Sequence, residues 1–210
     1  MNYLINNFGY VSQLFGQHLQ LTLVVLFFSL LISIPLGVLI VHIRWLQGPV
    51  LGILGVIYTI PSLSLFVLLI PLFGLGTTPA VIALVSYAQL LLVRNWVIGL
   101  ITVDPAVIEA ARGMGMNSWQ RFTQVEFPLA LPMLLAGIRL AALSSIGIGT
   151  IAAYINAGGL GILLFQGVIT ANNEKILAGS LAVSLLAVGS NYLLRFLEHR
   201  AETAVLGETR

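Results

Sequence analysis

Long apolar stretches with almost no charge restrict this chain to a narrow set of folds. Between residues 1 and 93 the only formally charged side chain is Arg44, and residues 140–173 contain none. Hydrophobic residues make up 59% of the sequence and charged residues 8%, and the mean hydropathy is +1.04. A chain of this composition cannot cover itself with the polar surface that a water-soluble globule needs. The sequence therefore predicts an integral membrane protein.

The lengths of the apolar stretches predict how often the chain crosses the membrane. A spanning helix needs about 20 apolar residues, because each residue rises about 1.5 Å and the hydrocarbon core is about 30 Å thick. The stretches are continuously apolar and do not alternate between two faces, which disfavours a β-barrel. We expect an all-α membrane protein with five transmembrane helices. The predicted spans are residues 19–43, 49–72, 78–101, 129–155 and 177–197.

The distribution of arginine predicts the direction of these spans. Cytoplasmic connections of membrane proteins carry an excess of Lys and Arg. Here the N-terminal stretch and two of the loops carry only one charged pair, Glu174 and Lys175. We therefore expect the N-terminus outside and the C-terminus in the cytoplasm. The arginines that decide this lie in the 1–2 connection, the 3–4 connection and the tail: Arg44, Arg112, Arg121, Arg195, Arg200 and Arg210.

The first 18 residues lack the basic start and the small-residue cleavage site of a removable signal peptide. Leu4, Phe8, Val11 and Phe15 recur at helical spacing, which indicates a short helix in the outer membrane interface. A disordered start to the first span is the alternative. The predicted organisation is an outer-side interfacial segment at 1–18, a single transmembrane domain at 19–198 with a polar loop at 102–128, and a cytoplasmic tail at 199–210.

The polar loop has the signals of two short helices separated by glycine. Asp104 followed by Pro105 is typical of a helix N-cap and first turn. We expect this helix to run to about residue 112 and to end at the glycines at 113 and 115. A second start at Asn117 or Ser118 leads to Pro128, which opens the fourth span.

The residues of this loop follow a recognisable spacing. The pattern E-A-A, three residues, Gly, nine residues, an aliphatic residue, one residue, an apolar residue and Pro is filled by Glu109, Ala110, Ala111, Gly115, Val125, Phe127 and Pro128. The E-A-A triplet alone would fit an ordinary amphipathic loop, because Ala and Glu are good helix formers. The full spacing resembles the cytoplasmic coupling loop of the membrane subunits of bacterial ABC importers. Two departures from the family pattern, Val for Ile and Phe for Leu, keep the apolar character.

The resemblance implies a type I ABC importer permease in the bacterial cytoplasmic (inner) membrane. Its loop would be held by a cytoplasmic ABC ATPase dimer, and it would work beside a second permease subunit, identical or paralogous, and an extracytoplasmic substrate-binding protein. Small alanine side chains let another backbone approach closely, and a carboxylate can pair with Arg or backbone donors. Methionine adds an adaptable apolar contact. The expected coupling residues are Glu109, Ala110, Ala111, Gly115, Met116 and Pro128.

We expect no catalysis and no bound cofactor or metal from this chain. It has no phosphate-binding G-x-x-x-x-G-K-[ST] motif, and Lys175 is its sole lysine, so ATP and Mg are expected on the partner ATPase. Cysteine is absent, and His18, His42 and His199 are scattered singly. No basic cluster with interleaved aromatic residues is present, so we expect membrane lipid but no nucleic acid among the partners.

A narrower resemblance bears on the cargo. Residues 58–84, 93–100, 103–116 and 127–141 look like permeases of the glycine betaine, choline, carnitine and proline betaine uptake group, and the Gly-rich stretch 152–161 fits as well. This resemblance implies import of compatible solutes. Related importers of methionine and other small nutrients share the loop, and residues 87–92 lack a proline that we associate with the osmoprotectant group, so a methionine or other small-nutrient permease is the alternative.

An ATP-independent channel or secondary transporter is an alternative of a different class. That class should show ionisable residues inside the spans or repeated halves. The predicted spans contain no carboxylate, and the sequence has no obvious internal repeat.

Three places in or beside the spans are candidates for the pathway or its gates. Proline inside a span frees a carbonyl and bends the helix, so its polar neighbours can line a bend, although hydrogen bonds between helices explain them equally well. A cation inside the fourth span should face the bundle or the partner permease, in a packing or a gating role. The Gly-rich stretch should form a turn or re-entrant loop on the outer side. The candidates are Tyr58, Pro61, Ser62, Arg139, Asn156, Gly158 and Gly159.

Overall fold

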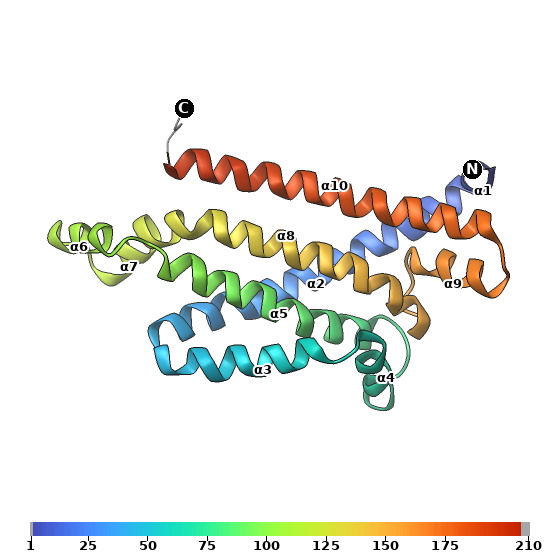
Figure 1. The fold of residues 1–210 in the computed structure, drawn as a ribbon, viewed down its shortest axis with the longest axis horizontal. Helices are drawn as coiled ribbons and strands as arrows, with labels where there is room; N and C mark the ends of the chain where they lie inside the picture. The colour runs from blue at the N-terminus through green and yellow to red at the C-terminus, as the bar shows by residue number, and fades with distance from the viewer. Residues whose placement is uncertain (1, 207–210) are drawn as a thin grey trace.

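The computed structural model of the protein describes residues 2–206 and contains no strand in that range. Long helices run side by side along one axis, as Figure 1 shows. The last four residues of the expected tail lie outside the described residues. The helices are α1 (Asn2–Asn6), α2 (Phe8–His42), α3 (Gln47–Thr59), α4 (Ser62–Phe73), α5 (Thr77–Ile101), α6 (Pro105–Gly113), α7 (Ser118–Arg121), α8 (Phe127–Ala152), α9 (Gly161–Ile169) and α10 (Asn173–Leu206), with 3₁₀ turns at Arg44–Leu46 and Ala153–Ile155 and a π turn at Phe122–Glu126.

The long helices confirm the expected all-α membrane fold. Four helical stretches of the described chain are long and apolar enough to cross a membrane, and the α3–α4 pair is a fifth span if its two halves are counted as one. Helix α5 is the most buried of the spans and packs against α2, α3, α4 and α8. It is therefore the central helix, and α2 and α10 lie toward the outside of this single chain.

The first span begins earlier than the sequence indicated. Helix α2 runs without interruption from Phe8, so residues 8–18 are its first turns and not a separate interfacial helix. Val11 and Leu14 are buried against α8, α9 and α10, in a cluster that includes Ile146 and Leu163. This long-range packing holds the N-terminal turns in the bundle and replaces the expected boundary at residue 18.

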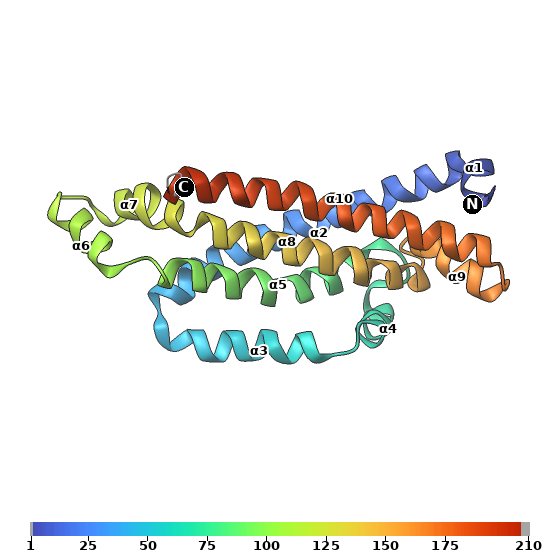
Figure 2. The same ribbon diagram turned by 45° about the horizontal axis from the view of Figure 1, so that its top comes forward.

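The second span is bent at Pro61, where the sequence analysis expected a proline to bend the helix. Helices α3 and α4 meet at an angle of 95°. Ile60 has ψ 129° and Pro61 has ψ 131°, both in the extended region. A residue before proline is pushed out of the helical region by the proline ring, so the helix stops at Thr59 and restarts at Ser62. Figures 1 and 2 show α4 lying across the end of α3.

Small residues bring the central helices close together. A Cβ atom placed on Gly137 of α8 would lie only 2.7 Å from the Cβ of Asn95 on α5. Close backbone approach at small residues is the common way in which membrane helices gain packing energy, because lipid offers no hydrophobic drive between helices. The α5–α8 pair is therefore closely packed, and the connecting loop extends from it.

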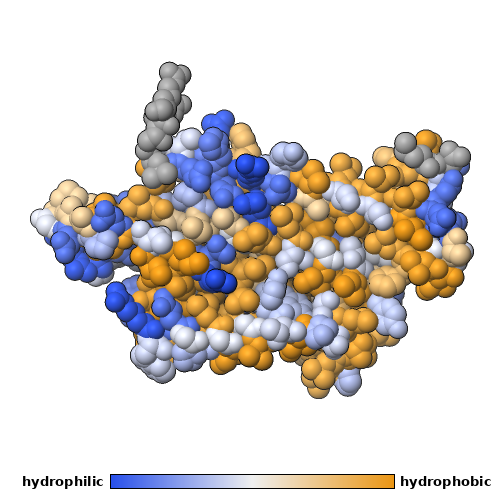
Figure 3. All heavy atoms as spheres, in the orientation of Figure 1, coloured by the Kyte–Doolittle hydropathy of each residue, from blue (hydrophilic) through white to orange (hydrophobic). Residues whose placement is uncertain are grey.

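The connections fall at two ends of the bundle. Helices α6 and α7 lie at the same end as the C-terminal end of α10, whereas the N-terminus and α9 lie at the other end, as Figures 1 and 2 show. Hydrophobic side chains dominate the face drawn in Figure 3, and hydrophilic residues gather over the α6–α7 end and the C-terminal part of α10. The fold thus brings the arginine-rich connections to one end.

Candidate functional site

Helix α6 is fixed at both ends by local backbone chemistry. The Ala106 N–H donates to Asp104 Oδ1 (2.8 Å), and Pro105 occupies the first turn, where its missing N–H costs nothing. At the other end the Met116 N–H donates to the Ala111 carbonyl (3.2 Å) and the Gly115 N–H to the Arg112 carbonyl (2.9 Å). This bond pair is a Schellman motif, and it requires the left-handed φ of +79° that Gly115 adopts.

The second half of the loop begins with a capped helix and continues into a π turn, which is wider than an α-helical turn. Asn117 and Gln120 form a reciprocal capping box with bonds of 2.9 and 3.0 Å. The chain then passes through the π turn into α8, where Pro128 lies in the first turn. Because proline has no N–H and its ring crowds the carbonyl four residues earlier, the wider turn lets the helix continue. An ion pair between Arg121 Nε and Glu126 Oε1 (2.6 Å) spans this turn.

The two alanines of the E-A-A triplet face opposite ways. Glu109 and Ala110 are exposed, whereas Ala111 is only 1% exposed and packs inside its own chain. The expected role of Ala111 required direct contact with another protein, and this buried side chain is not available for such a contact. Its small side chain instead lets α6 lie close against the rest of the loop. The exposed residues of the loop include Glu109, Ala110, Met114 and Trp119, which we call the exposed loop face, whereas Met116 is half-buried.

A row of aromatic rings connects the exposed loop face to the bundle core. The ring centroids of Trp119 and Phe122 lie 6.2 Å apart, those of Phe122 and Phe127 6.2 Å, and those of Phe127 and Trp96 6.1 Å. Trp119 is 71% exposed and Trp96 on α5 is 5% exposed. The row therefore makes a continuous series of ring contacts from the exposed Trp119 to the buried Trp96. The sequence analysis missed this row, although its spacing along 119–127 is visible in the sequence.

A hollow of about 560 Å³ opens beside α6. It lies between the corner that joins α2 to α3 and the end of α5. Its charged lining consists of Arg44, Glu109, Arg112 and Glu126, two cations and two carboxylates. The hollow therefore offers both hydrogen-bond donors and acceptors to a polypeptide that enters at this end.

The Gly-rich stretch lies at the opposite end of the bundle and is hydrogen-bonded to α2. Asn156, Gly158 and Gly159 all have positive φ, so the chain turns sharply there. The Gly159 N–H donates to Gln17 Oε1 (3.1 Å). His18 is fully buried beneath the turn, and its Nε2–H donates to the Ile146 carbonyl (3.1 Å).

A hollow of about 390 Å³ beside this turn is lined by polar groups that include Gln20, Thr77 and Asn156. The sequence analysis missed Gln17 and His18 as partners of the turn, because it placed them in a separate N-terminal segment. The only signal was the occurrence of two polar side chains next to each other in an apolar run.

The bend at Pro61 is stabilised by a residue that the sequence analysis did not single out. The Tyr87 hydroxyl donates to the Ile60 carbonyl (2.6 Å), which the bend frees from helix bonding. Tyr58 packs edge-on against Tyr87, with centroids 5.9 Å apart. Ser62 is the first residue of α4. The bend is therefore stabilised by contacts with Tyr87 on α5.

Arg139 is held by α10. Its Nε donates to Glu198 Oε2 (2.9 Å) and its Nη1 to Asn191 Oδ1 (3.3 Å). The pairing satisfies a cation that would otherwise be costly inside a span. The structure does not bring the candidate pathway residues together, since Pro61, Arg139 and the 156–159 turn lie on different helices and have no contact with one another among the bonds of residues 2–206. Residues 2–206 contain no group of His, Asp and Glu that could hold a metal ion.

Comparisons with known proteins agree on the kind of chain this is. The family model described as "Binding-protein-dependent transport system inner membrane component" matches residues 29–203. The osmoprotectant import permease protein OsmW of Salmonella typhimurium is 44% identical over 94% of this chain and 94% of its own length. The carnitine transport permease protein OpuCB of Listeria monocytogenes is 39% identical over 92% and 89%, and the glycine betaine/carnitine/choline transport system permease protein OpuCB of Bacillus subtilis is 34% identical over 95% and 92%.

Solved structures give the same fold. A chain of the MetNI methionine ABC transporter in an inward-facing conformation superposes with a TM-score of 0.77 at 27% identity, covering 90% of this chain and 93% of that chain. A chain of an amino acid ABC transporter crystallised with histidines has a TM-score of 0.74 over 92% and 97%, and at 20% identity it shows the fold alone.

Proposed function

Because this chain belongs to the family of binding-protein-dependent transport system inner membrane components, we propose that it is the permease subunit through which an ABC importer brings compatible solutes into the cell. The proposed cargo is glycine betaine, choline, carnitine and proline betaine. The cargo assignment rests on relatives that are 34–44% identical to this chain over about nine-tenths of both chains. These relatives are named for osmoprotectants, carnitine, choline and glycine betaine.

Methionine is the second candidate cargo. The transporter named for methionine shares the fold at a lower identity, 27%. Fold similarity is retained over longer evolutionary distances than substrate preference, and one fold serves many cargoes. The sequence relatives therefore weigh more than the structural neighbour in the choice of substrate.

The coupling role is assigned to the exposed loop face. A separate cytoplasmic ATPase dimer, which would carry ATP and Mg, is proposed to contact Glu109 and Ala110 on α6, with Met114 and Trp119 at the edge of the contact. Exposed Met and Trp beside small residues and a carboxylate are typical of protein interfaces. The aromatic row that begins at Trp119 supports the proposal, because it gives a displacement of the loop a packed route to α5.

Gly115, Met116, Pro128 and Ala111 are proposed to act one step removed from the ATPase. They set the shape of the loop through the Schellman motif, the π turn and the close packing of α6. The E-A-A pattern would then encode two contact positions, Glu109 and Ala110, and several positions that shape the loop.

The outer end is proposed to receive the substrate-binding protein. The turn at Asn156, Gly158 and Gly159 and its adjacent hollow are the proposed gate region there, and the Tyr58–Pro61–Ser62 bend is proposed to line the pathway. A second permease copy, identical or paralogous, would complete the pathway. The N-terminus would lie outside and the C-terminus in the cytoplasm, as the gathering of arginines at the α6–α7 end supports.

The test is uptake by a complex reconstituted from the permease, its ATPase and its binding protein in proteoliposomes. We expect uptake of radiolabelled glycine betaine that requires ATP and stops when the binding protein is left out. Methionine uptake at the rate expected for betaine would move the cargo to the second candidate. Uptake by the chain alone without ATP would overturn the proposed mechanism.

The orientation can be tested separately, because the chain contains no cysteine and each introduced cysteine is unique. A membrane-impermeant thiol reagent added outside intact cells should label Thr170→Cys and not Met114→Cys, and the reverse result would invert the topology.

A further inference from the structure

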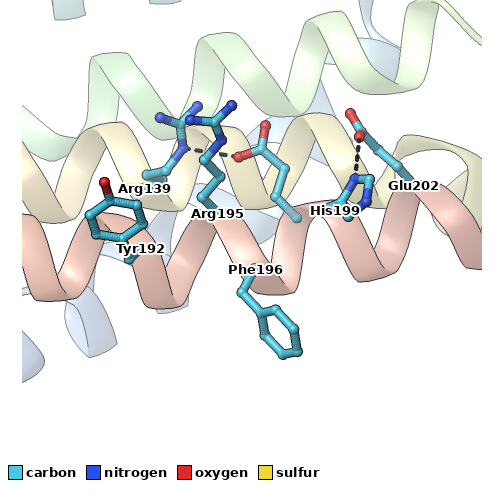
Figure 4. Close-up of a pocket in the computed structure, with 7 residues that line it drawn as sticks. Arg139, Tyr192, Arg195, Phe196, His199 and Glu202 are labelled. Carbon is cyan, nitrogen blue, oxygen red and sulfur yellow. Dashed lines mark hydrogen bonds and ion pairs between the residues drawn. The ribbon is translucent and has the colours of Figure 1, made fainter.

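The C-terminal part of α10 carries a charged hollow that the coupling mechanism does not use. Its volume is about 630 Å³, and it lies on the surface where α10 meets α8. Figure 4 shows the guanidinium groups of Arg139 and Arg195 pointing to the same side of α10, with Tyr192 beside them. The full lining is Arg139, Tyr192, Arg195, Phe196, Glu198, His199 and Glu202.

The charges in this hollow do not cancel around Arg195. Arg139 is paired with Glu198, whereas Arg195 forms no ion pair with any residue that the structure describes. The two arginines and two glutamates of the lining sum to zero, so the positive charge is local to Arg195 and is not a net charge of the hollow. Glu202 lies two turns further along α10, about 10 Å beyond Arg195 at 1.5 Å per residue. Its side chain is 48% exposed, and its carboxylate lies 3.6 Å from Nδ1 of His199 and forms no ion pair with Arg195.

The depth of Arg195 in the membrane follows from the sequence of α10. Residues 176–194 contain no charged side chain, and Lys175 and Arg195 bracket them. At 1.5 Å per residue this stretch is about 28 Å long, close to the hydrocarbon thickness of about 30 Å. Arg195 therefore lies where the hydrocarbon of one leaflet meets its headgroups. Tyr192, which is 67% exposed, lies one turn inside this boundary, at the depth where tyrosine is enriched in membrane proteins.

We propose that the hollow between α8 and α10 binds the phosphodiester headgroup of one anionic phospholipid. The phosphate carries one negative charge and accepts hydrogen bonds from the free Arg195 guanidinium, from the unused nitrogen of Arg139 and from the Tyr192 hydroxyl. Guanidinium binds phosphate through paired donors, and Arg195 lies at headgroup depth with Arg139 lining the same hollow. The acyl chains lie along the exposed apolar side chains of α10, which include Leu185, Val188 and Leu193. Basic pockets between helices at this depth are recognised sites for anionic headgroups.

The test uses the purified importer in nanodiscs of phosphatidylglycerol and phosphatidylcholine, followed by native mass spectrometry of the lipids that stay bound. The variant is Arg195→Gln, and the control is Arg200→Gln on the same helix, whose guanidinium stacks on Phe196 and does not line the hollow. We expect Arg195→Gln to bind phosphatidylglycerol about tenfold more weakly, as loss of one charge-assisted bond implies, with Arg200→Gln unchanged and Arg195→Lys within about threefold of the parent.

Two further experiments distinguish a lipid headgroup from free phosphate, and a bound lipid from a second permease on the same surface. Inorganic phosphate added in large excess should not displace the lipid, because it lacks the acyl chains. Displacement would show a free-anion site and overturn the proposal. The cysteine variant Tyr192→Cys should not form a disulfide-linked permease dimer. Efficient dimer formation, equal binding of phosphatidylcholine, or equal losses in the Gln variants at 195 and 200 would each overturn the lipid assignment.

Discussion

Replacing each of two adjacent alanines in α6, Ala110 and Ala111, by leucine should have different effects on stability. Ala111 is 1% exposed, so a leucine there must displace packed neighbours, and overpacking of this kind costs about 1–3 kcal/mol. Ala110 is exposed, and both residues are good helix formers, so Ala110→Leu should change the free energy of unfolding by less than about 0.5 kcal/mol. The two variants have the same chemistry and differ only in the direction of the side chain.

Although Ala110→Leu should leave the stability of the permease unchanged, it should weaken its coupling to the ATPase. If the ATPase approaches the α6 backbone closely at this position, the added side chain should weaken ATPase binding about tenfold, which corresponds to about 1.4 kcal/mol. ATP-driven uptake should fall with it, although the permease itself remains folded. Ala111→Leu should also lower uptake, but through a loop that no longer holds its shape.

Two measurements separate these effects. Thermal unfolding of the purified permease in detergent should show a lower melting temperature for Ala111→Leu, by about 2–4 °C for each kcal/mol in a chain of this length, and no change for Ala110→Leu. Capture of the purified ATPase should be strongly reduced for Ala110→Leu at a concentration near the Kd of the parent, where tenfold weaker binding leaves most of the ATPase free. Normal ATPase capture by Ala110→Leu, or an unchanged melting temperature for Ala111→Leu, would refute the assignment of the two faces.

Three other substitutions test the supports of the loop, the outer turn and the bend. Gly115→Ala forces alanine into φ +79°, so the loop should become more sensitive to limited proteolysis at a cost of about 1 kcal/mol, whereas Gly113→Ala, with nothing within 4 Å of the new Cβ, should not. Gly159→Ala combines φ +80° with a Cβ only 2.9 Å from Nδ1 of His18, and it should lower the melting temperature more than Gly115→Ala does. Tyr87→Phe removes the 2.6 Å hydrogen bond at the α3–α4 bend and should destabilise the permease by about 1 kcal/mol, measured by thermal unfolding.

The features that local chemistry dictates were predictable from the sequence. The N-cap at Asp104, the break at Gly115 and the restart at Asn117 each depend on residues within one turn, and the structure has all three. The number of apolar stretches also follows from length and composition alone. Short-range rules suffice in these cases because the partners of each bond are close in sequence.

The features that depend on distant packing were not predictable. Val107, Ile108 and Ala111 share one face of α6 by their helical spacing, but whether that face packs inside the chain or against a partner depends on distant contacts. The start of α2 at Phe8 depends on contacts with α8 and α10, and the angle at Pro61 depends on Tyr87, whose position in the chain gives no hint of this contact. Helix α9 is too short to be recognised as a span, since it has only 9 residues.

The central claim is that a separate ATPase drives this permease through the exposed loop face. The chain contains no cysteine, so Ala110→Cys introduces a single thiol at the proposed contact. A short thiol-to-amine cross-linker applied to the assembled importer should join this position to the ATPase, and Thr170→Cys at the opposite end of the bundle should give no such product. The absence of an ATPase adduct at Ala110→Cys in a complex that still transports, or equal adducts at both positions, would contradict the claim.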